Sequence, residues 1–425
     1  MNAKTLKEKI AAGALDAYGH LYQNPAAQKE RYLAAIDAFT ALYGADRDIR
    51  LFSVPGRSEL GGNHTDHNHG KVLAGAIDRD ILAVAAKNDD GVVRVHSEGY
   101  PEDAVPLSDA GNPDAFRHFN SRALLAGTCG GFLKRGYAVG GYDAYTTTQV
   151  LKGSGISSSA AFEVQCGNIM NYLYNGGRIP NEELAKIAQY AENTYFGKPC
   201  GLMDQMACAV GGFLSIDFLD PENPVITPIS FSLSDAGYQL CIVNTGGNHA
   251  NLNEDYASVP AEMKAVAAVF GQKVLRGLTE SQIVASIPLL RGTVGDRAIL
   301  RALHFLRENR RVEEEVAALQ KGDFPAFLSL VLASGNSSFE YLQNVFTVKN
   351  VGEQGLSLAL AVTEGLLGGK GCAWRVHGGG FAGTVQAFVK REYVDDYRAV
   401  MDSVFGEGSV MTLSVRPVGA TEIVI

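Results

Sequence analysis

Residues 153–161 are rich in glycine and serine and form the first candidate binding site. They read Gly-Ser-Gly-Ile-Ser-Ser-Ser-Ala-Ala and run directly into a helical pattern. Small residues let the backbone approach a ligand closely, and the free N–H groups of a helix's first turn point toward an anion. We therefore expect a phosphate to be bound by Gly153, Ser154, Gly155, Ser157, Ser158 and Ser159. The alternative is an ordinary loop capped by serine. No GxxxxGK followed by Ser or Thr occurs, which excludes the usual P-loop.

Residues 55–70 gather charged and imidazole side chains in one short loop. The segment reads PGRSELGGNHTDHNHG and contains Arg57, Glu59, His64, Asp66, His67 and His69. Asp and Asn side chains are suited to hydrogen bonds with sugar hydroxyls. The spacing His-x-Asp-His-x-His also offers imidazole and carboxylate ligands to a metal. A solvated polar loop is the third interpretation, and the segment alone does not decide among the three.

A third cluster, residues 378–383, reads Gly-Gly-Gly-Phe-Ala-Gly and matches GxGxxG literally. The dinucleotide-binding fingerprint needs a strand before the glycines and a helix after them. Here residues 384–389 alternate apolar and polar, which is the period of a strand. We therefore expect a glycine loop between two strands, either a plain hairpin tip or a loop lying against a ligand.

Taken together, these clusters resemble the motifs of the GHMP small-molecule kinases, and within them the galactokinases. Residues 55–70 are similar to PGRxNLIGEHTDYNxG, residues 153–161 to GxGLSSSA, and residues 378–383 to GGGFGG. Residues 200–205 resemble CGIMDQ, and residues 244–256 end like NSNVRHSLASSEY. Order and spacing agree from about residue 32 onward. No HRD or DFG set occurs, which excludes the protein kinases.

The resemblance implies an α+β fold with two lobes and the active site between them. The N-terminal lobe would resemble ribosomal protein S5 domain 2, and the C-terminal lobe would be ferredoxin-like. We place a helical extension at 1–31, the first kinase domain at 32–235 and the second at 236–425. The implied activity is transfer of the γ-phosphate of ATP, with Mg²⁺, to the anomeric hydroxyl of a sugar, with galactose favoured.

The resemblance also implies roles for individual residues. Asp204 would be the catalytic aspartate, acting as a base or as an orienting group, with Arg57 as its partner. Asn63, His64, Asp66, Gly201 and Tyr256 would bind the sugar. The serine-rich loop, with Gly379 and Gly380, would bind the nucleotide, and Ser159 and Glu192 would hold Mg²⁺. Without the family, we would interpret Asp204 as a helix N-cap, Glu192 as a solvent-facing helix residue and Tyr256 as an aromatic residue at a helix start.

Three of the motifs depart from the family pattern at single positions, and the first motif departs most. The family's Glu before His-Thr-Asp is Asn63, and that Glu is the expected partner of the sugar 6-hydroxyl. Glu59 replaces Asn, His67 replaces Tyr, Asn248 replaces Arg and Ala382 replaces Gly. A kinase for a C6-modified sugar such as galacturonate is therefore an alternative. A catalytically weak sugar sensor and a metal-dependent hydrolase built on His64–His69 are two others.

The elements that must position these motifs form a mixed pattern without a regular βαβ repeat, so α+β is favoured. We expect helices in 1–48, 160–173, 182–196 and most of 256–345, and strands at 81–87, 92–96 and on both sides of the 378–383 loop. The 425 residues carry a net charge of −9 and no basic block, which argues against nucleic acid as a partner. No apolar stretch is long enough to span a membrane, and the six scattered cysteines indicate reduced thiols. We expect a cytoplasmic protein; the sequence does not indicate its oligomeric state.

Overall fold

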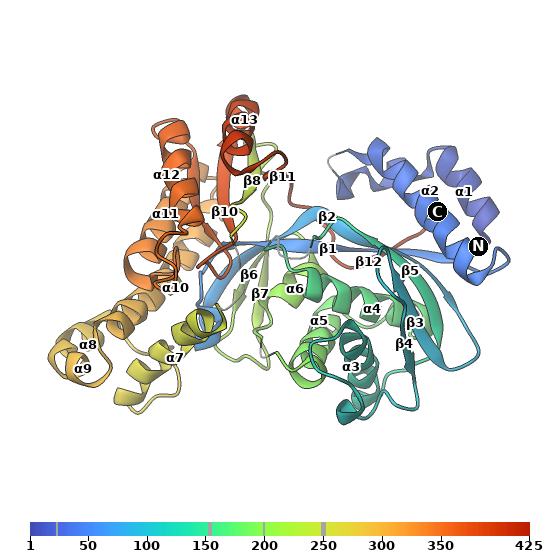
Figure 1. The fold of residues 1–425 in the computed structure, drawn as a ribbon, viewed down its shortest axis with the longest axis horizontal. Coiled ribbons are helices and arrows are strands. Elements are labelled where there is room, and N and C mark those ends of the chain that lie inside the picture. Colours follow the sequence, from blue (N-terminus) through green and yellow to red (C-terminus); the bar gives the residue numbers. More distant parts are fainter. Residues whose placement is uncertain (23, 152–154, 199, 248–251) are drawn as a thin grey trace.

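The fold of the computed structural model is built on two antiparallel-rich sheets (Figure 1). The structure describes residues 1–22, 24–151, 155–198, 200–247 and 252–425. The first sheet has the order β12-β1-β2-β5-β3-β4, with β6 and β7 continuing from the far half of β2. Only β3 and β5 pair in parallel among its ladders in the described part of the chain. Its strands are β1 (Arg50–Gly61), β2 (Lys71–Lys87), β3 (Val92–Ser97), β4 (Asp103–Pro106), β5 (Tyr142–Thr148), β6 (Phe213–Asp217), β7 (Val225–Ile229) and β12 (Thr421–Ile423).

Four helices cover one face of this sheet and carry the phosphate loop. Side chains Phe52, Ala83 and Ala85 of the strands pack with Cys129 and Ile169 of these helices. The expected helix over 182–196 is an α-helix followed directly by a π-helical turn, η4 (Ala191–Phe196). The helices are α3 (Ser121–Lys134), α4 (Ser158–Tyr174), α5 (Asn181–Tyr190) and α6 (Met203–Val210).

The N-terminal helices cover the opposite face, as Figure 1 shows beside the two chain ends. Leu82 and Val84 pack there with Ile36 and Phe39, whereas the alternate residues of β2 face α3 and α4. Strand β2 is therefore buried on both sides, which explains its nearly continuous apolar run. The elements are α1 (Ala3–Ala11), the 3₁₀-helix η1 (Ala14–Leu21) and α2 (Pro25–Tyr43). The expected limit of the extension at residue 31 falls inside α2.

The second sheet has the order β11-β8-β10-β9 and is antiparallel throughout. Cys241 and Val243 of β8 face α12 and α13, and the alternate residues Leu240 and Ile242 pack in the large core that includes α11. The glycine loop 378–383 joins β9 to β10, so the expected strand–loop–strand hairpin is confirmed. The elements are β8 (Tyr238–Asn244), β9 (Ala373–His377), β10 (Thr384–Lys390), β11 (Val410–Leu413), α11 (Phe324–Ser337), α12 (Gly355–Leu367) and α13 (Val394–Phe405).

Helix α10 (Asp296–Gln320) connects the two sheets, since it packs against β1 and β2 as well as α11. The remaining helices are α7 (Asn253–Val269), α8 (Glu280–Ala285) and α9 (Ile287–Thr293), with the short turns η2 (Asp66–Asn68), η3 (Pro113–Ala115), η5 (Ser338–Leu342) and η6 (Arg391–Tyr393). The last strand, β12, pairs with β1, so the C-terminal residues return to the first sheet. The division into domains at residues 31 and 235 stays a prediction.

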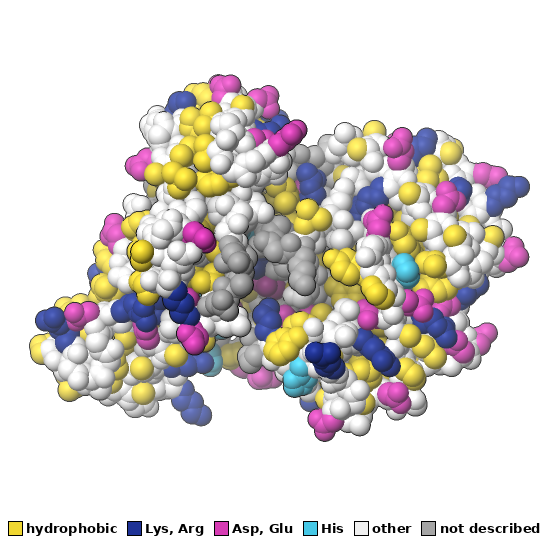
Figure 2. Space-filling model, viewed as in Figure 1, with side chains coloured by type: hydrophobic (Ala, Val, Ile, Leu, Met, Phe, Trp, Pro, Cys, Tyr) yellow, Lys and Arg dark blue, Asp and Glu magenta, His cyan; other side chains and the backbone are white. Residues whose placement is uncertain are grey.

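The surface and the cysteines have the character that the composition indicates. Figure 2 shows Lys and Arg interspersed with Asp and Glu on the face that it draws. All six cysteines are free thiols. None of the helices in the described part of the chain combines the length and the apolar character needed to cross a bilayer.

A buried ion pair fastens the N-terminal helices to the sheet. Arg31 of α2 lies 2.5 Å from the Oδ1 atom of Asp80, whose Oδ2 atom accepts a hydrogen bond from Tyr22 at 2.7 Å. Asp80 is fully buried, with Arg416 also nearby. Burial favours the neutral acid, but Arg31 and Arg416 outweigh it and hold the pKa of Asp80 below its usual range. The helical extension is therefore part of the packed fold.

Replacing Arg31 with Leu should lower the free energy of unfolding by about 3 kcal/mol, because it leaves a buried carboxylate short of a cation. Urea denaturation at pH 7 measures this difference. Because the folded pKa of Asp80 is depressed, its contribution is present above pH ~4 and is lost as the pH falls through the folded value. The difference should therefore narrow in acid. Lys4→Ala, an exposed change on α1, is the control, and equal stability of the two variants would contradict the assignment.

Candidate active site

Arg57 and Asp204 form an ion pair at the centre of the candidate site. Arg57 comes from β1 and Asp204 from the first turn of α6, and the Nε and Oδ1 atoms are 2.8 Å apart. The other carboxylate oxygen accepts a hydrogen bond from the Ser157 hydroxyl at 2.7 Å. The N-cap of α6 is Leu202, so the interpretation of Asp204 as a capping residue is wrong. About a third of the Asp204 side chain stays exposed, which leaves it accessible to a ligand.

The charge state of Asp204 follows from these partners. Burial raises the pKa of the carboxyl, but the charge and hydrogen bond of Arg57, together with the Ser157 hydroxyl, outweigh burial and hold the pKa below its usual range. Asp204 is therefore ionised at neutral pH. An ionised, partly exposed carboxylate with a fixed cation behind it can orient a hydroxyl and accept its proton.

The backbone brings the first and second motifs into direct contact. The Nη1 atom of Arg57 donates to the carbonyl of Gly155 at 2.7 Å, and the Arg57 N–H donates to Ile156. A side chain at Gly56 would place its Cβ 2.7 Å from that same Ile156 carbonyl, so glycine is needed for the approach. On the other side, Gly155 lies against residues 377 and 384 of the β9–β10 hairpin. All three clusters therefore meet at one place.

The serine-rich loop begins α4 as expected, but one of its serines does not cap the helix. Ser157 occupies the N-cap position with φ of 64°, in the left-handed region, and its hydroxyl is directed to Asp204. Ser158 and Ser159 form the first helical turn, where N–H groups are free to bind an anion. Three positions that the sequence singled out lie outside the described residues: Gly153, Ser154 and Asn248.

Glu192 and Ser159 form an oxygen pair beside this helix start. The Oγ atom of Ser159 lies 3.4 Å from the Oε1 atom of Glu192, and Gln205 donates to Oε2 at 2.7 Å. Glu192 is buried in η4, so its interpretation as a solvent-facing residue is wrong. A hydroxyl and a carboxylate are ligands that Mg²⁺ accepts, and the donor set fits that ion.

Two groups near Glu192 carry no motif, and sequence analysis does not identify them. Lys198 lies with its Nζ atom 3.0 Å from Oε1 of Glu192 and balances that charge. Glu163 is fully buried next to Gln205, and burial together with the charge of Glu192 raises its pKa well above the usual range. Both effects favour the protonated form of Glu163. A lone Lys after Gly197 and a Glu on a helix give no signal of either role.

Four of the predicted sugar residues form two groups, Asp66 with Gly201 and His64 with Tyr256. Asp66 and Gly201 touch, since a Cβ on Gly201 would overlap the Asp66 carboxylate, and both line a cavity of about 210 Å³. His64 and Tyr256 instead contact the glycine loop, through Nε2 of His64 to the carbonyl of residue 379 at 2.9 Å and the Tyr256 hydroxyl to that of residue 380 at 3.0 Å. Cavities of about 940 and 750 Å³ open elsewhere, along β6–β7 and beside residues 347–358. Arg57 and Asp204 line none of these three cavities, and only the smallest is lined by predicted sugar residues, so cavity size does not mark this site.

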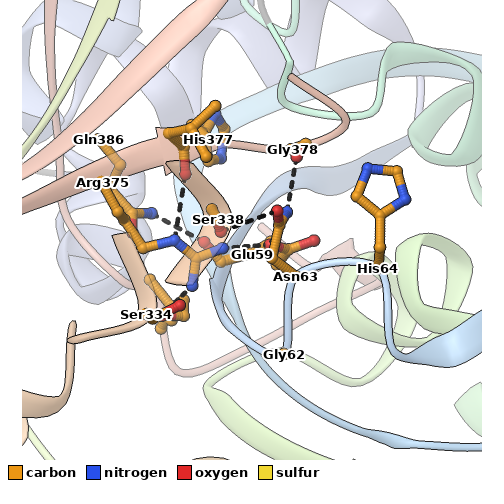
Figure 3. Close-up of polar contacts among 12 residues, drawn as sticks. Glu59, Gly62, Asn63, His64, Ser334, Ser338, Arg375, His377, Gly378 and Gln386 are labelled. Carbon is orange, nitrogen blue, oxygen red and sulfur yellow. Dashed lines mark hydrogen bonds and ion pairs between the residues drawn. The ribbon is translucent and has the colours of Figure 1, made fainter. Parts of the chain in front are cut away.

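Asn63 lies in surroundings different from those expected of an exposed sugar ligand. It is fully buried, and its amide contacts protein groups on every side (Figure 3). The His64–His69 segment also gives no support to a hydrolase. Among the residues that the structure describes, no three His, Cys, Asp or Glu side chains are arranged to hold a metal ion.

Comparison with known proteins identifies the family. Residues 37–87 match the galactokinase galactose-binding signature, and residues 123–212 match the GHMP kinases N terminal domain. The galactokinase of Streptomyces coelicolor is 33% identical over 378 residues, which cover 87% of this chain and 92% of that protein. The chain belongs to the galactokinase family. It is therefore a sugar kinase, as the motifs predict.

Further comparisons agree with this assignment and with the fold. The galactokinase of Actinobacillus pleuropneumoniae serotype 3 is 31% identical over 374 residues, covering 86% of this chain and 92% of that protein. A crystal structure of Lactococcus lactis galactokinase complexed with galactose is similar with a TM-score of 0.77 at 23% identity, covering 92% of this chain and 99% of that one. Mevalonate kinase of Methanococcus jannaschii gives 0.60 at 14% identity, covering 86% and 98%. These similarities confirm the two-lobed GHMP kinase fold.

Replacing Arg57 with Met should raise the pKa of Asp204, because burial then acts without the cation that opposes it. Titration of ¹³C-labelled aspartate by NMR measures the shift. Arg94→Met, which removes a cation from Asp143 on the far part of the sheet, is the control and should leave Asp204 unchanged. An Asp204 carboxylate that titrates identically in the Arg57 variant and the wild type would show that the pair does not set its charge.

Proposed function

We propose that this protein transfers the γ-phosphate of ATP to the anomeric hydroxyl of galactose. The observation that carries the proposal is the Asp204 carboxylate, kept ionised by Arg57 at the point where the three motifs meet. The names of the relatives support the same activity. A kinase of this kind needs few covalent groups, since phosphoryl transfer depends mainly on positioning and on charge neutralisation.

Asp204 is assigned to the sugar hydroxyl. Its depressed pKa makes it a weak base toward an unreacted alcohol, so its first task is to accept a hydrogen bond and fix the hydroxyl for in-line attack. The proton becomes acidic as the oxygen bonds to phosphorus, and at that stage Asp204 can accept it. Arg57 keeps the carboxylate charged beforehand and lies close enough to offset charge on the transferring group.

The nucleotide is assigned to the start of α4, where Gly155 and the three serines at 157–159 present backbone N–H groups and hydroxyls. Gly379 and Gly380 belong to the glycine loop, whose flanking residues 377 and 384 lie against Gly155. Ser159 and Glu192 would hold Mg²⁺, which supplies neutralisation of the phosphate oxygens when it is bound. Lys198 already lies beside Glu192 and adds a cation to the same place.

The sugar is assigned to the space between Asp204 and the two groups of predicted sugar residues. Asp66 is anchored by its contact with Gly201 and offers a carboxylate to a hydroxyl pair. His64 and Tyr256 bring a ring nitrogen and a hydroxyl, each now bonded to the glycine loop. His64 and Tyr256 would each stay hydrogen-bonded if a sugar hydroxyl replaced the loop carbonyl that each now contacts.

A kinase for a C6-modified galactose is the second candidate, and the observation that favours it is that position 63 lacks the carboxylate of the family pattern. Retention of Arg57, Ser159, Glu192 and Asp204 argues against a sensor without turnover. The deciding experiment is an assay with ATP and Mg²⁺ against hexoses and their 6-deoxy, 6-acid and 2-acetamido forms. Galactose as the best substrate supports the proposal, and a clear preference for galacturonate supports the alternative. No phosphorylation of any galactose derivative would overturn both.

Asp204→Asn should lower kcat by about 10²- to 10⁴-fold, because the amide can orient the hydroxyl but cannot take its proton. The far-ultraviolet spectrum and the melting temperature report whether the fold survives. Asp235→Asn is a matched change at an exposed position and should keep full activity. Wild-type turnover in Asp204→Asn would rule out both an orienting charge and a base.

Ser159→Ala should raise the KM for Mg²⁺–ATP and the Mg²⁺ concentration needed for half-maximal rate, since it removes one oxygen of the Ser159–Glu192 pair. The KM for the sugar is the internal control and should stay close to the wild-type value, because the sugar is assigned to other residues. Steady-state kinetics with each substrate varied in turn measures both. If the dependence of the rate on ATP and Mg²⁺ is unchanged, the serine-rich loop begins helix α4 but does not bind the nucleotide.

A further inference from the structure

Positions 59 and 63 have exchanged their chemical types relative to the galactokinase pattern. The pattern has Asn followed four residues later by Glu, and this chain has Glu59 followed by Asn63. In the structure the two side chains touch, with the Nδ2 atom of Asn63 donating to Oε1 of Glu59 at 3.0 Å (Figure 3). A carboxylate and an amide have therefore traded places between hydrogen-bonded neighbours.

Asn63 has no hydrogen-bonding capacity left for a sugar. Its second Nδ2 hydrogen is donated to the carbonyl of Gly378 at 2.7 Å. Its Oδ1 atom accepts from Asn344 at 2.9 Å and from Ser338 at 3.2 Å. The residue is fully buried. A carboxylate here would place its oxygens against Glu59 and the Gly378 carbonyl, neither of which can donate, so these contacts require the amide.

The carboxylate of Glu59 contacts a buried cation of the second sheet. It is almost fully buried and forms an ion pair with Arg375 of β9, which is itself fully buried. The same guanidinium donates to the Leu60 carbonyl at 3.1 Å. One carboxylate thus joins β1 of the first sheet to β9 of the second. Asn63 extends this connection to Gly378, the first residue of the glycine loop.

We infer that Asn63 is a positioning residue that holds the segment 55–70 against the glycine loop 378–383, and that it does not contact the C6 group of the sugar. The inference rests on the proposed sugar-kinase function. The exchange has a consequence for substrate specificity. The side chain at position 63, which would accept a hydrogen bond from the 6-hydroxyl in the family pattern, here forms all its hydrogen bonds with protein groups. Discrimination for or against a C6 substituent then falls to other groups in the cleft, and the 6-hydroxyl contributes little.

The wild-type enzyme tests this inference without any variant. Loss of a hydroxyl that faces a buried charged acceptor reduces kcat/KM by roughly tenfold or more. On the same scale, we expect galactose and 6-deoxygalactose to differ by less than about fivefold in kcat/KM. A kcat/KM for galactose more than about tenfold above that for 6-deoxygalactose would overturn the inference.

Asn63→Asp keeps the shape of the side chain and removes its N–H donors. We expect a lower melting temperature and a higher KM for ATP, because the glycine loop loses a contact, with the galactose to 6-deoxygalactose ratio unchanged within about twofold. A residue that bound C6 would change that ratio and leave the KM for ATP alone. Asn350→Asp, an exposed change of the same kind, is the control.

The double variant Glu59→Gln/Asn63→Asp restores a donor between the two positions at the net charge of the wild type. The decrease in its melting temperature should be smaller than the sum of the decreases in the two single variants. The reason is that the new amide at position 59 can donate to the new carboxylate at position 63. Simple additivity would show that the two residues are not coupled and would contradict the inference. This cycle needs no substrate, so it is decided even if the assay with galactose derivatives fails and with it the proposed function.

Discussion

The buried guanidinium of Arg57 is the constraint on which the active centre depends. A cation removed from water must meet a carboxylate and carbonyl oxygens, and Asp204 and Gly155 supply them. Arg57 lies on β1, and these partners come from the first turn of α6 and the loop before α4, so satisfying one charge fixes three segments relative to one another. The carboxylate that results is ionised, partly exposed and aimed at the start of a helix. We propose that this placement supports phosphoryl transfer.

A second buried pair, Glu59 with Arg375, holds the two sheets together, as the Arg57–Asp204 pair holds the loops of the active site. It lies between β1 and β9, and Asn63 connects it to Gly378. Both pairs start from β1, on residues two apart in the sequence, and therefore share one strand as their support. The first motif therefore contacts both the serine-rich loop, through Arg57, and the glycine loop, through Asn63. A change in that motif is expected to alter both loops.

Much of this arrangement could be predicted from the sequence, because its signals are local. The serine-rich loop leads into α4, and the alternation after Gly383 gives a strand, so the literal GxGxxG match is a hairpin loop, as predicted. The partners of Asn63 could not be predicted in this way. Ser338 and Asn344 lie 275 and 281 residues away along the chain, and no pattern within one element reports such contacts. The hydrogen bond from the Ser157 hydroxyl to Asp204 could not be predicted for the same reason, because it depends on where α6 packs against α4.

The central claim is that Asp204 and the start of α4 face one reacting pair of atoms. A crystal structure with galactose, Mg²⁺ and a non-hydrolysable ATP analogue tests it most directly. We expect the sugar's anomeric oxygen within about 3.2 Å of the Asp204 carboxylate, and the γ-phosphate at the first turn of α4, in line with that oxygen. A sugar bound with another hydroxyl at Asp204, or a nucleotide bound away from Ser157–Ser159, would contradict this arrangement.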